Sequence, residues 1–228
     1  MIIQIYAFTR IEDAVQAVAA GVDQIGFVAG DYGIVHGELD FEVASRLARE
    51  VVPPAQSVAL TMSTDVKEIL RMAETVRPDI VHISSETDAV GIGKMMEIRE
   101  RLDPKIKLMK AIGVVNQSSV DDAISYAEVS DILLLDTKIS HMPGVGATGE
   151  THDWNISQNI VRLSTAPVIL AGGLSTENVA GAIRMVNPWG VDSNTSTNIP
   201  GSPFLKDIER IRAFVKAVRS VETGGTNE

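Results

Sequence analysis

The chain has 228 residues, 45% of them hydrophobic, which is enough for one large α/β core or two small ones. Its formal net charge of −10 argues against nucleic acid or an anionic membrane surface as a partner. The lack of cysteine excludes disulfides, thiolate metal sites and a cysteine nucleophile. No apolar run approaches the roughly 20 residues of a membrane span, so we expect a soluble, cytoplasmic protein.

The first half of the chain alternates short apolar runs with amphipathic stretches. Thr9 and Glu12 have the spacing of a capping box, which predicts a first helix that Gly21 ends. A long loop, AGDYGIVHGEL, follows the second apolar run. The pattern predicts strands at 2–8, 24–28, 57–61 and 80–83, and further helices at 41–51, 66–73 and 89–102.

The second half continues the same alternation. Ser175 occupies the N-cap position of a helix whose apolar residues run to Val186. The polar residues 223–228 are expected to form a disordered tail. The pattern predicts strands at 106–112, 131–135, 166–171 and 190–192, and further helices at 120–127, 156–163 and 204–221.

Eight strands, each followed by a helix, predict a single (β/α)₈ TIM barrel over residues 1–222. A doubly wound open sheet is the alternative, although such sheets more often have fewer strands. In a barrel, functional residues follow the C-terminal ends of the strands. Polar residues at those positions are therefore the candidates for chemistry.

Small residues follow the last two predicted strands. Gly172 and Gly173 end the first of these strands, and Asn194, Thr195 and Ser196 follow the second. Glycine lets the backbone approach a phosphate closely, and free backbone N–H groups bind anions. The two segments predict a site for the phosphate of a small substrate. The alternative is that the two glycines only form a tight turn.

Asp136 is the strongest candidate for a catalytic residue. It ends an apolar strand, where desolvation raises the pKa of a carboxyl and suits it to proton donation. Lys110 ends the preceding strand, and an ammonium among apolar residues needs an acidic partner, for which Asp136 is the natural choice. The alternative for Asp136 is a structural carboxylate that caps a loop or pairs with Lys138.

His82 and Tyr6 are further candidates at strand ends. His82 interrupts an apolar strand and is either a base, a hydrogen-bond donor to substrate, or a buried structural histidine. Tyr6 can donate a hydrogen bond, but a phenol is a poor base without help. His36, His141 and His152 lack metal-ligand spacing, so we expect no metal. The glycine-rich loop 144–149 is either a lid or a neighbour of the phosphate site.

The sequence resembles the phosphoribosylanthranilate isomerase family of tryptophan biosynthesis over nearly its whole length. The segments that carry the resemblance are LLLDTK, GATGETHDW, PVILAGGLSTENVAGAI and GVD, with further matches at residues 4–10, IEDAVQAVAAGVDQIGFV and IRAFVKAV. The resemblance implies a TIM barrel without a cofactor that catalyses an Amadori rearrangement, in which an aminoaldose phosphate becomes a ketose. It implies that Asp136 is the general acid and that Gly172, Gly173 and residues 194–196 hold the phosphate.

The sequence departs from that family at two positions: the residue that the family uses as general base, and the residue that contacts the carboxylate of the anthranilate. The family opens with K-I-C-G and uses the cysteine as the base, whereas this chain has Gln4, Ile5, Tyr6 and Ala7. The family also places an arginine after the second strand to contact the anthranilate carboxylate, and residues 34–38 here contain none. These departures indicate a divergent member or a paralogue with a different phosphorylated substrate.

Our first hypothesis is an isomerase that acts on a phosphorylated sugar or sugar-amine. Asp136 is then the acid, His82 or Tyr6 is the base, and Lys110 is an electrostatic partner. One alternative is a phosphosugar lyase or aldolase in which Lys110 forms an imine. Another is a barrel that binds a phosphorylated ligand without catalysis. The organic part of the substrate and the oligomeric state stay open, with a homodimer as one option.

Overall fold

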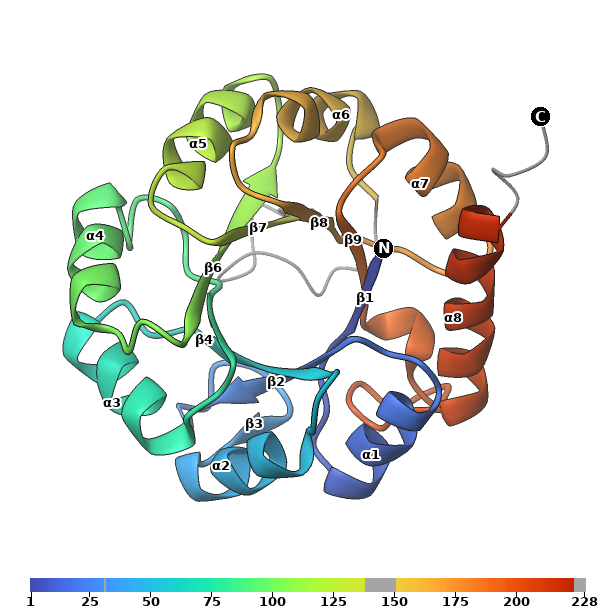
Figure 1. The fold of residues 1–228 in the computed structure, drawn as a ribbon, viewed down its shortest axis with the longest axis horizontal. Helices are drawn as coiled ribbons and strands as arrows, with labels where there is room; N and C mark the ends of the chain where they lie inside the picture. The colour runs from blue at the N-terminus through green and yellow to red at the C-terminus, as the bar shows by residue number, and fades with distance from the viewer. Residues whose placement is uncertain (31, 138–150, 224–228) are drawn as a thin grey trace.

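The structure, a computed structural model that describes residues 1–30, 32–137 and 151–223, is a closed parallel barrel inside a ring of helices (Figure 1). Pairing of β1 with both β2 and β9 closes the ring, which confirms the predicted TIM barrel. The ring strands are β1 (Ile2–Ile5), β2 (Gln24–Ala29), β4 (Gln56–Thr61), β5 (Ile80–Ile83), β6 (Lys107–Val114), β7 (Ile132–Thr137), β8 (Val168–Leu170) and β9 (Gly190–Ser193).

Helices follow the strands and cover the outside of the barrel, as Figure 1 shows. They are α1 (Ile11–Ala19), α2 (Phe41–Glu50), α3 (Val66–Val76), α4 (Ile92–Arg101), α5 (Ser118–Ala127), α6 (Trp154–Leu163), α7 (Val179–Val186) and α8 (Ile208–Thr223), with a short 3₁₀ turn, η1, at Thr195–Thr197. None of these helices has the length and hydropathy that crossing a membrane requires.

Side chains along each strand alternate between two apolar cores. On β6, Leu108 and Ile112 pack in the outer core between the strands and the helices, and Met109 and Ala111 pack in the core inside the barrel. Both sets are almost fully buried, so every strand is apolar on two faces. The alternation decides which polar residues at the strand ends can meet one another.

Several predicted boundaries moved. The capping box at Thr9 is absent, because α1 begins after Arg10 and its N-cap makes no side-chain hydrogen bond. The regular part of α7 begins at Val179, but Ser175 makes the contacts of an N-cap: its carbonyl accepts the Val179 N–H at 3.0 Å and its Oγ accepts the Glu177 N–H at 3.3 Å. The predicted loop after β2 contains a short strand, β3 (Glu38–Leu39). The predicted tail lies largely outside the described residues.

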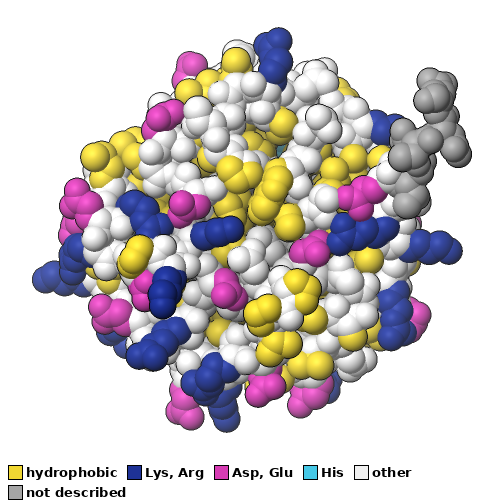
Figure 2. Space-filling model, viewed as in Figure 1, with side chains coloured by type: hydrophobic (Ala, Val, Ile, Leu, Met, Phe, Trp, Pro, Cys, Tyr) yellow, Lys and Arg dark blue, Asp and Glu magenta, His cyan; other side chains and the backbone are white. Residues whose placement is uncertain are grey.

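The surface matches the mixed composition of the chain. On the face drawn in Figure 2, acidic and basic side chains are interspersed and leave no broad patch of one sign. Despite the net charge of −10, this face carries no large single-sign field.

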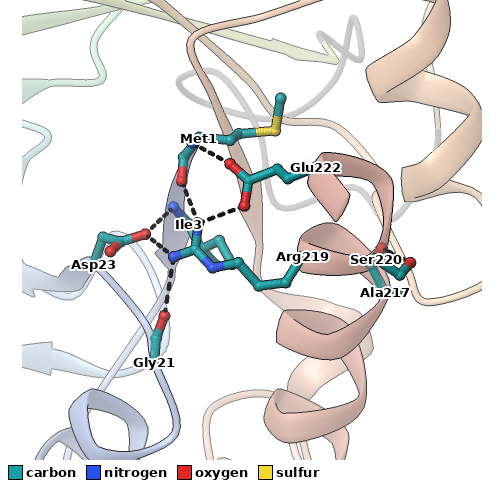
Figure 3. Close-up of polar contacts among 8 residues, drawn as sticks. All are labelled: Met1, Ile3, Gly21, Asp23, Ala217, Arg219, Ser220 and Glu222. Atoms are coloured by element: carbon teal, nitrogen blue, oxygen red, sulfur yellow. Dashed lines mark hydrogen bonds and ion pairs between the residues drawn. The ribbon is translucent and has the colours of Figure 1, made fainter. Parts of the chain in front are cut away.

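The first residue of the chain meets the last turn of α8 where the ring closes (Figure 3). Arg219 on α8 donates to the Met1 carbonyl at 2.7 Å and to Asp23 Oδ2 at 2.8 Å. The same Asp23 oxygen accepts the backbone N–H of Ile3 at 2.8 Å. Glu222 bonds both the N-terminal ammonium and Arg219. This cluster attaches α8 to the first strand.

We expect Arg219→Met to lower the free energy of unfolding by about 1–2 kcal/mol, because Asp23 and the Met1 carbonyl lose their shared donor. Urea denaturation measures the effect. Arg212→Met is the control, since Arg212 forms an exposed ion pair with Glu209 on the same helix, and it should change stability by less than about 0.5 kcal/mol. Equal midpoints for the two variants would contradict a stabilising role for the cluster.

Candidate active site

A cavity of about 270 Å³ lies at the C-terminal ends of β7, β8 and β9. It brings the predicted acid together with all five residues predicted to hold phosphate. Its lining is Asp136, Gly172, Gly173, Leu174, Ser175, Asp192, Ser193, Asn194, Thr195 and Ser196. Functional residues of this fold occupy that face of the barrel, so we take this cavity as the candidate active site.

A larger cavity of about 580 Å³ opens at the opposite end, where the loops that precede β5 and β6 meet α3 and α4. Its charged residues are of both signs, Arg77 and Lys105 among the cations and Asp79 and Asp103 among the anions. Side chains at the N-terminal ends of barrel strands serve stability rather than chemistry. We therefore do not take it as the active site.

Hydroxyl groups join the two loops that line the candidate site. Ser193 Oγ and Ser196 Oγ each donate to the Leu174 carbonyl at 2.9 Å, and the two hydroxyls lie 2.7 Å apart. These bonds hold the turn after β8 against the turn after β9. The small residues of both turns therefore border the same cavity.

Position 172 accepts only glycine, because both its backbone conformation and its neighbours exclude a side chain. Its φ is +82°, and a Cβ there would lie 2.5 Å from Thr137 Oγ1 and 3.0 Å from His152 Nδ1. Those two atoms are themselves 3.2 Å apart, and His152 Nε2 lies 2.6 Å from Ser157 Oγ. His152 thus supports the glycine turn from below, a structural position that its sequence context did not indicate.

Lys206 fixes the loop after β9 from inside the protein. Its side chain is only 6% exposed, and it lies beneath Asn194 and Thr197. The ammonium donates to the Tyr6 carbonyl, the Asn194 carbonyl (3.2 Å), Asn194 Oδ1 (3.1 Å), Thr197 Oγ1 (3.3 Å) and Asn198 Oδ1 (2.6 Å). All of these acceptors are neutral. Sequence reasoning missed Lys206 because it placed this residue in the last helix, which begins only at Ile208.

Asp136 lies at the mouth of the barrel, on the inner face of β7 two residues after Leu134. Burial raises the pKa of Asp136 to about 7, although the Thr137 N–H, which donates to Oδ1 at 2.7 Å, opposes the rise. A carboxyl with a pKa near neutrality holds a proton that it can donate at physiological pH. The geometry is therefore compatible with the predicted acid.

Asp192 is a second carboxyl in the same cavity, and sequence reasoning gave it no role. It is 7% exposed, and its Oδ1 accepts a hydrogen bond from Gln4 Nε2 at 3.1 Å. Burial, followed by repulsion from Asp136, raises the pKa of Asp192 to about 8. In the sequence, the only sign of a role for Asp192 is that a carboxylate ends the short predicted strand 190–192 and precedes small polar residues.

The structure brings Tyr6 and His82 together inside the barrel but not into the cavity. Tyr6 Oη and His82 Nδ1 are 2.8 Å apart, and the side chains are 5% and 2% exposed. The Tyr6 ring fills the space above Gly26, where a Cβ would lie 2.4 Å from it. Burial raises the pKa of Tyr6 and lowers that of His82 to about 3. Neither residue lines the candidate site.

Lys110 points away from the candidate site, so the predicted ion pair with Asp136 is wrong. Its ammonium donates to the carbonyls of Ser85 (2.5 Å) and Ala111 (2.9 Å) and lies 5.5 Å from the centre of the Tyr126 ring on α5. Lys110 shares the outer face of β6 with Leu108, whereas Asp136 is on the inner face of β7. An imine to substrate inside the barrel is therefore excluded for Lys110.

The loop between β2 and α2 folds around the carboxylate of Glu38. The backbone N–H groups of residues 32–35 all donate to the Glu38 carboxylate, at 2.6–2.9 Å. Burial raises the pKa of Glu38, but these four bonds outweigh it and lower the pKa. The predicted lid at 144–149, together with Lys138 and His141, lies outside the described residues.

We expect Lys206→Met to lower the free energy of unfolding by about 2–4 kcal/mol, because several buried oxygens lose their donor at once. Urea denaturation measures this change. Lys216→Met, an exposed position on α8, is the control and should leave the midpoint within about 0.5 kcal/mol of the parent. A normal midpoint for the Lys206 variant would mean that the loop does not depend on the ammonium.

Comparison with known proteins identifies one family by its family model and by its curated relatives. The family model for N-(5′-phosphoribosyl)anthranilate (PRA) isomerase matches residues 3–217. An isomerase of Methanosarcina mazei is 34% identical over 96% of this chain and 95% of its own length, and one of Rhodopseudomonas palustris is 32% identical over 90% of both chains. The crystal structure of the Thermotoga maritima enzyme superposes with a TM-score of 0.81 at 29% identity, covering 96% of this chain and all of that one. The chain belongs to the phosphoribosylanthranilate isomerase family of aldose–ketose isomerases.

Proposed function

We propose that this protein isomerises N-(5′-phosphoribosyl)anthranilate to the corresponding 1-amino-1-deoxyribulose 5-phosphate, with Asp136 as general acid. The observation that carries the proposal is the single cavity that holds a carboxyl of raised pKa beside two turns of small residues. A related isomerase of known structure binds reduced 1-(o-carboxyphenylamino)-1-deoxyribulose 5-phosphate. That structure has a TM-score of 0.79 and 27% identity over 96% of this chain.

The phosphate is proposed to bind between the turn after β8 and the turn after β9. Gly172, Gly173, Asn194, Thr195 and Ser196 line this part of the cavity. No lysine or arginine lines it among the described residues, so backbone N–H groups and hydroxyls supply the hydrogen bonds. The buried amine of Lys206 lies beneath the second turn, and because burial lowers its pKa to about 7, it adds positive charge to the local field only in its protonated form.

Asp136 is proposed to protonate the ring oxygen of the aminoaldose. Opening of the ring leaves negative charge on that oxygen unless a proton arrives as the bond breaks. Because burial keeps Asp136 partly protonated near neutral pH, the proton is available where it is needed. Asp136 and the phosphate turns line the same cavity, so a substrate held by its phosphate places its ring near the acid.

The loop after β2 offers no cation for the carboxylate of the anthranilate. The loop after β2 presents Glu38 and its ring of backbone donors, and residues 32–37 contain no arginine or lysine. The binding energy for the anthranilate carboxylate must therefore come from elsewhere in the chain. Other phosphorylated sugar-amines are the alternative substrates. A cytoplasmic homodimer stays a prediction; one related isomerase of solved structure is dimeric.

We expect Asp136→Asn to reduce kcat for N-(5′-phosphoribosyl)anthranilate by roughly 10²- to 10⁴-fold, because the amide cannot donate a carboxyl proton. Product formation under saturating substrate measures the change. Asp121→Asn, an exposed position on α5, is the matched control and should retain the parent rate.

Two outcomes would contradict this function. Equal turnover by the parent and the Asp136 variant would remove Asp136 from the mechanism. Complete inertness of the parent toward this substrate, combined with a rise in Tm on adding inorganic phosphate, would favour a phosphate-binding barrel or another sugar-amine substrate.

A further inference from the structure

The strand register places two carboxyls on neighbouring positions of the barrel rim. Leu135 of β7 pairs with Leu170 of β8, and Leu170 pairs with Val191 of β9. The next residue on each strand is Asp136, Ala171 and Asp192, and Ala171 packs in the core inside the barrel. Two strand spacings separate the two aspartates, about 10 Å between backbones.

Nothing larger than a methyl group stands between the two carboxyls on that rim. Ala171 is the intervening residue, and Gly172 follows it. Both carboxyls line the cavity of about 270 Å³. A substrate in that cavity therefore contacts acidic groups from two sides.

A buried glutamine, Gln4, donates a hydrogen bond to Asp192 but leaves its own carbonyl oxygen without a partner among the described residues. Gln4 is opposite Asp192 in the β1–β9 register and donates Nε2 to Asp192 Oδ1 at 3.1 Å. The Gln4 Oε1 atom is buried without a hydrogen-bond partner among the described residues. An unsatisfied buried oxygen destabilises a fold, so the amide that donates to Asp192 is present at some loss of stability.

The two carboxyls influence one another. Repulsion from Asp136 contributes to the raised pKa of Asp192, after burial. Lys206 and the Gln4 amide lower that pKa in part. Asp192 has the higher pKa of the two, about 8 against about 7, so a proton shared by the pair lies mostly on Asp192. The state with Asp136 protonated and Asp192 ionised, which the reaction needs, is therefore the minor one of the two singly protonated states.

We propose that Asp192 is the general base of this enzyme and acts with Asp136 as an acid–base pair across Ala171. The proposal rests on the isomerase function proposed above. The hydroxyl of Tyr6 lies against His82 inside the barrel, and neither side chain lines the cavity. Asp192, on the strand that pairs with β1, is the acceptor that lines it.

The proton transfers balance within the pair. Asp136 gives its proton to the ring oxygen as the C1–O bond breaks, and the amine lone pair forms a C1=N bond. Asp192 then takes the C2 proton; the C2–H electron pair forms C1=C2, and the C=N pair returns to nitrogen. Transfer of the proton from Asp192 to C1, with loss of the C2 hydroxyl proton to Asp136, gives the ketose and restores both carboxyls.

The first test is the pH dependence of kcat/KM. The parent should show a bell-shaped profile, because Asp192 must be ionised and Asp136 protonated. Asp192→Asn should reduce kcat roughly 10²- to 10⁴-fold and remove the low-pH limb, whereas Asp192→Glu should restore part of the rate and that limb. Tyr6→Phe and His82→Gln should keep the limb. Loss of the limb in either of those two variants would overturn the proposal.

The second test does not need turnover. We expect the pKa of Asp192, followed by carboxyl-carbon NMR, to fall in Asp136→Asn, because one repelling carboxylate is gone. An unchanged Asp192 titration would overturn the pair. The two proposals fail in different ways. If the parent turns over the substrate and needs Asp136, but Asp192→Asn keeps the parent rate and pH profile, then Asp192 is not the base and the proposed function stands. If the parent is inert toward the substrate, the proposed function itself is contradicted.

Discussion

The parallel pairing of β9 with β1 is the constraint on which the site depends. It closes the ring, while the β7–β8 and β8–β9 pairings set the ends of those strands side by side, so that residues more than 50 positions apart in the chain line one cavity. The Arg219 cluster reinforces the β1–β9 seam from outside by attaching α8 to the first strand. Without closure, Gln4 would have no partner on β9, and Asp192 would lose the amide that donates to it.

Burial of charge at this rim is unfavourable for folding and useful for chemistry. The interior of the barrel is apolar, and two carboxyls at its edge have raised pKa values as a result. The fold compensates with polar groups that point at the rim: the Gln4 amide from below and Lys206 beneath the adjoining loop. These groups hold Asp192 and the turn after β9 in one arrangement.

The sequence could predict the barrel, the glycine and serine turns and the rim position of Asp136, because each depends on a local pattern: alternation of strands and helices, small residues after a strand, or a carboxylate at its end. It could not predict the direction of Lys110. Both faces of a barrel strand are apolar, so the neighbours Leu108 and Met109 look alike in sequence although one faces the helices and the other the interior. A change of one residue in position along the strand moves a side chain from the inner face to the outer face.

Tyr6 ties the first strand to the strand that carries Asp192. Its ring fills the space above Gly26 and its hydroxyl lies 2.8 Å from His82 Nδ1, so this residue contributes packing inside the barrel rather than a group that lines the cavity. The N–H of Tyr6 also donates to the Ser193 carbonyl, next to Asp192. The end of the first strand therefore holds β9 in place at the mouth of the barrel, where the carboxyl that β9 carries lines the cavity.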